Sequence, residues 1–468
     1  MVRPSLIATI SVVALLYAGA ARANGAFPDS QSIMTPESRP HEIRLATNFG
    51  IIASDDDGQN WVWSCERPET NNGSLYQMGP APTSRLYVIS SEGMAFSDDD
   101  TCGWTVARVP STSTTIFDAF PDPTKASRVL AVAATANDAG VSYSAMESSD
   151  SGATFATTRY TAAMGDNLTG IEIAKANPQT VYMSILSGPT LVPKLARTTD
   201  GGTTWKAEDL SAKLPTKTTL IRIIAVDPTN ADRVYLRTHS AAGDAFAVAV
   251  AGTNGFTVTT PLTFPDGILS AYARLSTGTI VLAAVVGLDN VAYRSTDGGA
   301  TFQPLPAPPN VRALSARGTT LYVVADNEAD GYAVGTSVDM GQTWQPLMRY
   351  DQIAAIQACV HATCQVDCLM RASSGQWADD FCAATAPAPH DAGGEPPDAG
   401  DGMDATAPAD AAPKDSGGGG SGGTDASVGP PSKSGCGCAV GDGGTPGAAL
   451  VIVALAFAAL VRRRAPSP

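Results

Sequence analysis

The sequence predicts an all-β fold built from one repeated unit. An eight-residue motif, here called the octet, recurs along the chain, as in residues 295–302. It consists of a hydroxyl residue, Asp two positions later, Gly two after that, and an aromatic residue three further on. From residue 41 onward, short strands of alternating polarity flank the octets, and no long amphipathic helix interrupts them. A regular repeat of this kind is a better guide to domain count than the chain length of 468 residues.

Each position of the octet has a physical role in a tight turn. The Asp carboxylate can accept hydrogen bonds from the amides of the turn, Gly supplies a positive φ, and the aromatic residue anchors the returning strand. The residues assigned to these structural positions are Ser54, Asp56, Gly58 and Trp61; Asp99 and Trp104 in a degenerate copy; Asp150, Gly152 and Phe155; Asp200, Gly202 and Trp205; Asp297, Gly299 and Phe302; and Asp339, Gly341 and Trp344.

The spacing of the octets gives the number of repeats. Successive octet Asp residues are 42 to 51 residues apart, except for one double-length gap between Asp200 and Asp297. The middle of this gap, residues 247–256, holds an alternating strand, a Gly-containing turn and an aromatic residue. We interpret it as a further repeat that has lost its Asp, which makes seven repeats in total.

Each repeat supplies four strands. An apolar strand ending in Asp/Asn-Pro comes first, as in residues 223–228, and a β-branched and aromatic strand follows, as in residues 233–236. One strand then enters the octet and another leaves it. A four-stranded antiparallel meander of this length is a propeller blade, so residues 41–358 are predicted to form a seven-bladed β-propeller.

The two ends of the repeat region predict how the ring closes. The first repeat begins at its second strand, near residues 41–47, and the apolar segment 352–357 has no octet after it. We predict that this segment returns as the inner strand of the first blade. Closure of this kind removes exposed sheet edges.

The N-terminal residues predict export. Residues 1–23 contain a lone Arg3, an apolar run, and Ala21-Arg22-Ala23 at the cleavage position, which is typical of a signal peptide. The alternative, an N-terminal membrane anchor, is less favoured because the apolar run is short. Residues 24–40 form a polar lead-in.

The formal charge of −15 and the lack of a Lys/Arg-rich run argue against nucleic acid as a partner.

Cysteine usage fits an oxidising compartment. Residues 359–382 form a Cys-rich appendage with Cys359, Cys364, Cys368 and Cys382. They could bind zinc with His361 nearby, but export favours two disulfides, with all three pairings open. Cys65 and Cys102 lie at similar positions on adjacent blades, and we expect them to pair with each other.

The C-terminal part divides into a linker and a tail. Residues 383–434 are rich in Ala, Pro, Gly, Asp and Ser, which predicts a disordered acidic tether. Residues 435–468 contain Cys436 and Cys438, an almost wholly apolar run from 447 to 461, and three Arg residues. This tail resembles the MYXO-CTERM sorting tag. The resemblance implies recognition by a membrane protease, removal of the hydrophobic helix, and retention at the cell surface through lipid on a Cys such as Cys436. The alternative is a plain tail anchor without processing.

The octet resembles the Asp box, or BNR repeat, of sialidase-like β-propellers. The resemblance implies that the octets lie at the periphery, on the side away from the central pocket, and that their Asp residues are structural. Residues 55–57 and 98–100 are runs of Asp that could hold calcium. Because no complete ligand loop is visible, we expect solvated turns there instead.

A sialidase needs an Arg cluster, a Tyr nucleophile with a Glu partner, and an Asp acid/base. The Phe/Tyr-Arg-Ile-Pro motif of that family is absent, because Arg44 stands in Glu-Ile-Arg-Leu-Ala. Polar residues on the predicted inner strands are weak ligand-binding candidates at the channel mouth: Arg222, Arg274, Arg312, Tyr272, Glu172 and Asp118. The alternative is that they satisfy one another or face channel water. We assign no catalytic residue, no metal site and no cofactor.

The sequence therefore favours a non-enzymatic, exported propeller that is anchored at the cell surface and binds a protein or a surface glycan. One alternative is a sialidase-like glycoside hydrolase, and another is an assembly factor for a membrane complex. We expect a monomer whose further partner is the sorting protease at the membrane.

Overall fold

The computed structural model describes residues 30–65, 75–90, 93–138, 140–373 and 380–384. The predicted signal peptide, the linker from residue 385 onward, and the tail with Cys436 and Cys438 lie outside the described residues.

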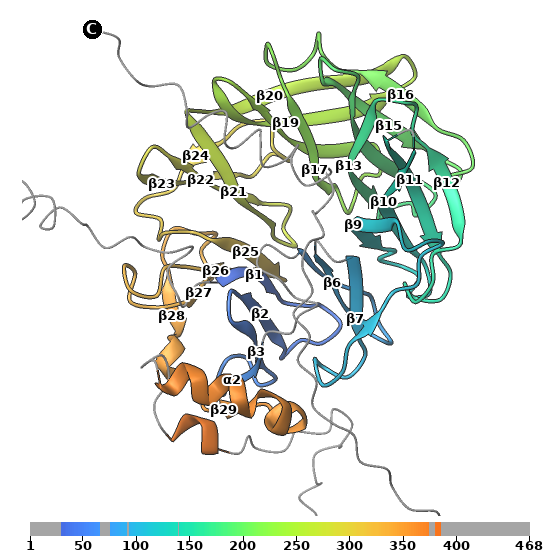
Figure 1. Ribbon diagram of the computed structural model, residues 1–468. Helices are drawn as coiled ribbons and strands as arrows, with labels where there is room; N and C mark the ends of the chain where they lie inside the picture. The colour runs from blue at the N-terminus through green and yellow to red at the C-terminus, as the bar shows by residue number, and fades with distance from the viewer. Residues whose placement is uncertain (1–29, 66–74, 91–92, 139, 374–379, 385–468) are drawn as a thin grey trace, which may run out of the picture. The chain divides into compact units, whose positions relative to one another are not determined.

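The described chain forms seven antiparallel sheets arranged in a ring, each with strands paired in sequence order (Figure 1). The first three blades contain β1 Ser30–Met34, β2 Ile43–Thr47, β3 Gly50–Ser54 and β4 Val62–Cys65; β5 Leu75–Met78, β6 Leu86–Ser90, β7 Gly93–Ser97 and β8 Thr105–Val106; and β9 Thr114–Pro121, β10 Val129–Asn137, β11 Gly140–Ser148 and β12 Thr157–Thr161.

The next four blades contain β13 Asp166–Ile173, β14 Val181–Ser187, β15 Val192–Thr198 and β16 Lys206–Asp209; β17 Leu220–Val226, β18 Arg233–Ser240, β19 Gly243–Gly252 and β20 Gly255–Pro265; β21 Gly267–Arg274, β22 Ile280–Val286, β23 Asp289–Ser295 and β24 Gln303–Pro304; and β25 Ala313–Arg317, β26 Thr320–Val324, β27 Val334–Ser337 and β28 Gln345–Met348. The predicted seven-bladed, all-β propeller is therefore confirmed, and the repeat without an Asp is the fifth blade.

The core lies between the blades rather than inside any one of them. The second strand of each blade is buried on both faces, which explains why strands such as β14 and β22 are nearly continuous apolar runs. The six hydrophobic clusters of the described residues each join a pair of adjacent blades, and the largest joins the first blade to the last. Burial of large side chains on both faces, such as Tyr182 and Tyr235, holds neighbouring blades together.

The octets form compact hydrogen-bonded turns between the third and fourth strands. In the sixth blade, Ser295 Oγ donates to Asp297 Oδ1 at 2.7 Å and accepts from the Gly299 amide at 2.9 Å. Asp297 also accepts from the Thr301 amide at 2.9 Å and from the Thr301 hydroxyl at 2.6 Å. Gly299 has a φ of +88°, and a side chain there would meet Tyr235 and Phe246 of the preceding blade. The bond from the leading hydroxyl to Asp occurs in all six octets, including the degenerate one at Asp99.

The predicted ring closure is wrong. The inner strand of the first blade is β1, which pairs antiparallel with β2 and lies within the segment that we expected to be a polar lead-in. The first and last blades meet side by side, where Thr35 Oγ1 lies 2.7 Å from Ser315 Oγ and Arg317 donates to the Glu42 carbonyl at 2.9 Å. Each blade is thus built from one contiguous stretch of chain, and no strand is exchanged to close the ring.

Segment 352–357, which was expected to close the ring, is part of a longer outer segment, here called the strap. It comprises η1 Tyr350–Gln352, β29 Ala355–Ile356, η2 Ala358–Val360, α2 His361–Ser373 and η3 Phe381–Ala383. β29 pairs in parallel with β4, the outermost strand of the first blade. In Figure 1 the strap lies beside the first blade, at the opposite edge of the sheet from β1.

Three disulfides fix the strap, and they correct the predicted pairing. Cys65 pairs with Cys364, Cys102 pairs with Cys359, and Cys368 pairs with Cys382. Cys65 and Cys102 therefore bond to the strap and not to each other, because the strap passes over the outer edges of the first two blades. All six cysteines in the described part of the chain are in disulfides, which rules out the zinc alternative for them.

The two Asp runs lie in half-exposed turns, as expected, and they are also paired with arginines. Arg44, which is only 2 % exposed, contacts Asp55 at 2.7 Å and Asp100 at 3.3 Å. Arg317 contacts Asp57 at 2.7 Å, and Arg85 contacts Asp98 at 2.6 Å. These acidic runs therefore join neighbouring blades at the rim through ion pairs.

Candidate functional site

Two adjoining cavities open at one end of the channel, where the inner strands end. One has a volume of about 350 Å³ and the other about 590 Å³, and they share Phe120, Pro123 and Lys175. The smaller cavity is lined by the ends of inner strands β13, β17 and β21, and it contains Glu172, Tyr272 and Arg274. Three of the six predicted ligand-binding candidates thus lie together at the channel mouth.

These cavities lie at the same end of the ring as the octets. The first and third strands of an antiparallel meander run in the same direction, so the octet after the third strand is at the end where the inner strand finishes. The resemblance to sialidase-like propellers implied that the octets lie on the side away from the central pocket. For the cavities at this mouth, that expectation is wrong.

Three carboxylates connect neighbouring blades through backbone amides of the inner strands. Asp118 of the third blade accepts from the Ile171 amide of the fourth at 3.0 Å, and Glu172 of the fourth accepts from the Val226 amide of the fifth at 2.6 Å. Asp244 of the fifth blade accepts from the Leu269 amide of the sixth at 2.8 Å.

The amides that donate to these carboxylates lie beside irregularities in the inner strands. β13, β17 and β21 each contain a bulge or register shift within a few residues of these amides. A bulge leaves an amide unpaired within its own sheet, and the carboxylate of the preceding blade satisfies it. The three acids are therefore clamps between blades.

Burial raises the pKa of the two clamps on the inner strands. Burial raises the pKa of Glu172 to about 8, against the opposing effect of the Val226 amide, and the charge of Asp118 raises it further. Burial also raises the pKa of Asp118 to about 6, although the nearby Arg222 guanidinium and the Ile171 amide act to lower it. Glu172 is thus largely protonated at pH 7, while most of Asp118 is ionised.

Tyr272 and Arg274 complete the smaller cavity. Burial raises the pKa of Tyr272 well above 10, and its hydroxyl has no hydrogen-bond partner within the described part of the chain. Arg274 contacts Asp227, a buried residue of the fifth blade, at 3.2 Å. The phenol hydroxyl is therefore buried beside the cavity without a partner among the described residues, whereas the guanidinium is held by an ion pair.

The three predicted arginines do not form one cluster. Arg222 lies near the start of β17, and Arg312 directly precedes β25 and contacts Asp326 at 3.2 Å. Arg274 is the last residue of β21, four to five residues further along the strand direction, or roughly 10 Å or more along the channel. Arg222 is near Asp118 in the channel wall instead, because both side chains approach Gly170.

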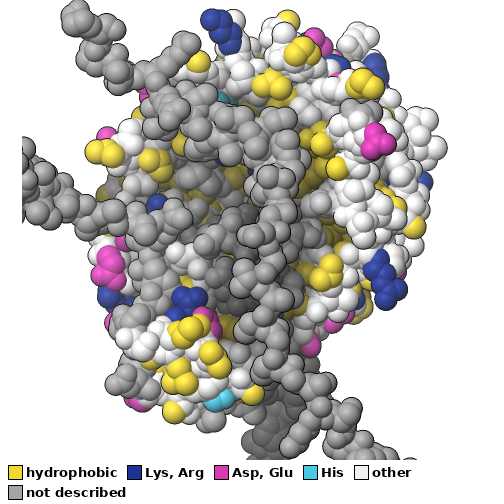
Figure 2. Space-filling view, in the orientation of Figure 1, with side chains coloured by type: hydrophobic (Ala, Val, Ile, Leu, Met, Phe, Trp, Pro, Cys, Tyr) yellow, Lys and Arg dark blue, Asp and Glu magenta, His cyan; other side chains and the backbone are white. Residues whose placement is uncertain are grey.

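The larger cavity is mostly apolar, and sequence reasoning missed it. Pro36, Met78, Pro80, Phe120 and Pro123 line it, and Lys175 of the fourth blade contacts Glu37 of the first at 3.4 Å across it. The Asp/Asn-Pro motif that ends several inner strands was a usable signal, because it places prolines at one end of the ring. Figure 2 shows Lys and Arg side chains spread singly over the described surface of this view, without one basic patch.

Within the described residues, no group of three or more His, Cys, Asp or Glu side chains is suited to hold a metal ion. No helix in the described part of the chain has the length and apolar character to cross a membrane. The disulfides are typical of an extracellular or otherwise oxidising environment.

No protein-family model matches the chain, and no curated protein matches it in sequence. The chain is similar to several solved structures. A puromycin-hydrolysing peptidase from Mycobacterium tuberculosis has a TM-score of 0.50 and 12% identity, covering 69% of this chain and 53% of that one. A GH74 xyloglucanase from Xanthomonas campestris has a TM-score of 0.36 and 13% identity, with coverage of 69% and 58%. YCF48 from Cyanidioschyzon merolae has a TM-score of 0.43 and 13% identity, with coverage of 66% and 94%.

This chain spans little more than half the length of the peptidase and the xyloglucanase. At 12% identity the likeness to the peptidase shows the fold alone, and the fold hosts unrelated functions. The chain is a seven-bladed β-propeller closed by side-to-side packing of its first and last blades.

Proposed function

We propose that this protein is an exported binding protein whose channel mouth receives an extended, apolar segment of a partner protein. In this proposal the octets are Asp boxes, and the C-terminal tail is a sorting tag that keeps the propeller at the cell surface.

The observation that carries the proposal is the lining of the larger cavity. Prolines, Met78 and Phe120 form an apolar floor of about 590 Å³, while Lys175 and Glu37 supply a few polar groups at its edge. Pockets of this composition bind apolar groups and use a few polar contacts to orient them. The acids nearby, Asp118 and Glu172, already accept amides of the next blade, which fits a rigid binding scaffold.

A steric block tests the proposal. Ser38 is exposed and lines the larger cavity, so Ser38→Trp should obstruct it. The matched control is Ser113→Trp, an exposed Ser before the start of β9, at the other end of the ring. A photo-cross-linking amino acid at Gln77, followed by mass spectrometry, identifies the bound segment in cells that produce the full chain.

A synthetic peptide of the captured sequence should bind the wild type and the Ser113→Trp variant equally in calorimetry. Its affinity for Ser38→Trp should fall at least about tenfold. Binding of a surface polysaccharide that Ser38→Trp abolishes, with no peptide captured at Gln77, would replace the protein partner by a glycan. Mass spectrometry of the native C-terminus tests the tail, because a chain that still carries residues 447–461 contradicts processing.

One observation favours a second candidate, a glycoside hydrolase. Glu172 holds a proton at neutral pH and opens on the smaller cavity beside the unpartnered Tyr272 hydroxyl, so it could donate a proton to a leaving group. A panel of fluorogenic glycosides tests this with wild type, Glu172→Gln and Arg222→Ala. Turnover that Glu172→Gln abolishes supports the hydrolase, and a wild type that cleaves none of the substrates rejects it.

A further inference from the structure

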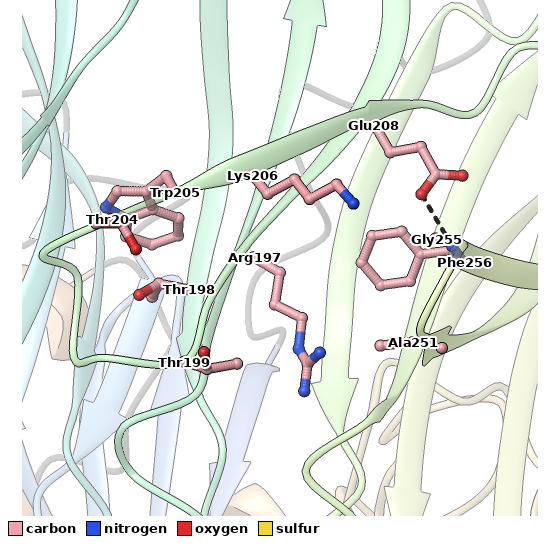
Figure 3. A pocket seen from close by; sticks show the side chains of 11 residues that line it. Arg197, Thr198, Thr199, Thr204, Trp205, Lys206, Glu208, Ala251, Gly255 and Phe256 are labelled. Carbon is pink, nitrogen blue, oxygen red and sulfur yellow. Dashed lines mark hydrogen bonds between the residues drawn. The ribbon is translucent and has the colours of Figure 1, made fainter.

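A cavity of about 320 Å³ lies at the rim of the propeller, between the fourth and fifth blades (Figure 3). One side is formed by β15, β16 and the fourth octet, and the other by the hairpin of β19 and β20. It shares no lining residue with the two cavities at the channel mouth.

Complete octets cover the corresponding place between other blades. Gly152 of the third octet lies against Met94 and Tyr87 of the second blade, and Gly299 lies against Tyr235 of the fifth. The Tyr87 hydroxyl donates to the Ser151 carbonyl at 3.0 Å, and the Tyr235 hydroxyl donates to the Gly298 carbonyl at 3.3 Å. An octet turn thus packs over the rim of the preceding blade.

The fifth blade lacks an octet, so no octet turn covers the rim of the fourth blade. Gly252 pairs directly with Gly255, so only two residues remain in the turn between β19 and β20. Tyr182 is the tyrosine of the fourth blade that corresponds to Tyr235. Its hydroxyl donates to the Ala231 carbonyl at 2.8 Å, since no octet carbonyl is present. The missing turn leaves the rim of the fourth blade uncovered, and the cavity occupies that place.

Aromatic side chains flank the cavity on both sides. In Figure 3, Trp205 and Phe256 stand on opposite sides, with the side chains of Arg197 and Lys206 between them. The indole N–H of Trp205 donates hydrogen bonds to two backbone carbonyls. Phe256 packs against Tyr182 with ring centroids 6.2 Å apart. Both rings are therefore fixed in place and present apolar surface.

The cavity carries an excess of positive charge, although the whole chain has a net charge of −15. Arg197 contacts Asp232, but its buried Nε has no partner among the described residues. Glu208 accepts from the Phe256 amide at 2.9 Å and contacts Lys213, so its charge is compensated. The exposed Lys206 ammonium makes no hydrogen bond or ion pair within the described chain, and its charge acts only through space on the nearby Glu208 carboxylate, so its N–H donors are available to a ligand.

We propose that this cavity binds a small organic anion with a flat apolar body. Arg197 and Lys206 hold the anionic group, and Trp205 and Phe256 enclose the apolar body by stacking and edge contacts. The site is independent of the channel mouth, and it exists because one repeat lost its octet.

Calorimetry on the full chain with 2-naphthoate as the probe tests the site. Wild type should bind the probe, and the uncharged analogue 2-naphthamide should bind at least about tenfold more weakly, because it lacks the charge that the cations hold. Lys206→Glu should lower the affinity for 2-naphthoate by at least about tenfold. Lys217→Glu is the matched control, since Lys217 is exposed and lines none of the described cavities, and it should bind like wild type.

A second variant tests the origin of the cavity. Replacing the two residues between Gly252 and Gly255 by the turn of residues 297–301 should fill the site and abolish binding, with the circular dichroism spectrum unchanged. The proposal is overturned if wild type does not bind 2-naphthoate, if it binds the amide equally well, or if Lys206→Glu binds like Lys217→Glu. Because Lys206 is exposed and unpaired, its substitution leaves the fold intact and keeps the test decisive.

Discussion

The octet Asp residues at the rim and Glu172 in the channel wall each use a carboxyl group to accept backbone amides. The pKa of the octet carboxyl is lowered, whereas the pKa of the Glu172 carboxyl is raised. In the octet, hydrogen bonds from Thr343 hold the pKa of Asp339 down at about 2. In the wall, burial raises the pKa of Glu172 to about 8. Both carboxyls accept backbone amides.

The number of donors and the access of water explain the difference. Asp339 accepts four hydrogen bonds, from the Ser337 and Thr343 hydroxyls and from the Gln342 and Thr343 amides, while solvent reaches it from outside. Glu172 has one donor, the Val226 amide, to offset the loss of hydration. An acid saturated with donors stabilises the fold when it is charged, whereas an acid with few donors in a largely buried position does so when it is neutral.

The largest expected effect comes from Asp244, which connects the fifth blade to the sixth. The Asp244 side chain is 0% exposed and contacts Arg237 and His239 at 2.7 Å each, in addition to the Leu269 amide. Asp244→Ala removes the carboxylate from the part-exposed Arg237 and His239 side chains and leaves the buried Leu269 amide without its acceptor, so it should cost about 2–3 kcal/mol of unfolding free energy. Denaturant unfolding at pH 7 measures this loss.

Asp244→Asn keeps an acceptor for the Leu269 amide and should cost clearly less than the Ala variant. Equal losses in the two variants would mean that the amide bond contributes nothing beyond the charge. A loss below about 1 kcal/mol in both would show that Asp244 does not clamp the fifth blade to the sixth.

The next effect is a pH dependence that separates wall from rim. Glu172 has its pKa raised from about 4.3 in an unfolded chain to about 8, so the folded state binds the extra proton between these values. Its contribution to stability is therefore fully present below about pH 4 and is lost as the pH rises towards 8. The octet Asp residues do the reverse, because their stabilisation is present above pH 4 and is lost as the pH falls below it.

Thermal unfolding of wild type and Glu172→Gln from pH 5 to pH 9 measures the wall contribution. The neutral amide retains an acceptor for Val226, so the variant should gain relative to wild type by on the order of a few kcal/mol across this range. Parallel curves for the two proteins would show that Glu172 is charged in the folded state at neutral pH.

A smaller effect is expected at the rim. Asp297→Ala removes four acceptor bonds in an exposed turn, from the Ser295 and Thr301 hydroxyls and from the Ala300 and Thr301 amides, and should cost about 1–2 kcal/mol. Asp297→Asn, which retains one oxygen, should cost about half as much. Chemical denaturation at pH 7 distinguishes these values, and a loss as large as that of Asp244→Ala would erase the contrast between rim and wall.

The smallest effect concerns the side chain of Thr301, the seventh residue of its octet. The Thr301 hydroxyl donates to Asp297 Oδ2 at 2.6 Å, and Thr154, Thr204 and Thr343 repeat this bond in other octets. Thr301→Val should cost about 0.5–1 kcal/mol, and Thr301→Ser should be close to neutral because it keeps the hydroxyl. The midpoint of urea unfolding measures both. A loss in Thr301→Ser as large as in Thr301→Val would show that the methyl group, and not the hydroxyl, matters.

The sequence predicted the blades well because the octet is a local device, complete within eight residues. Ring closure was missed because it depends on contacts between residues far apart. β1 offers only Ile33 and Met34 as apolar residues, whereas segment 352–357 is more apolar and looked like the better inner strand. The wrong disulfide partners followed from this error, since Cys359 and Cys364 reach the rim only if the strap runs outside.

The candidate site was predictable in part. Asp118 and Glu172 were found because they interrupt apolar inner strands, and a buried acid in such a place needs a partner. Their partners could not be found, because the amides that donate to them lie beside strand bulges that leave no clear signal in the sequence. The recurring Thr of the octet was visible in the sequence and was overlooked.

The outer strap also determines how the molecule carries mechanical load. A pull on the chain beyond residue 384 passes through Cys382 and Cys368 into α2, and then through Cys364 and Cys359 to the outer strands of two blades. This path is covalent, so tension enters the ring at its circumference, and the seam between the first and last blades is not the first place to be stretched. A ring closed by an exchanged C-terminal strand would instead have met the same tension with hydrogen bonds alone.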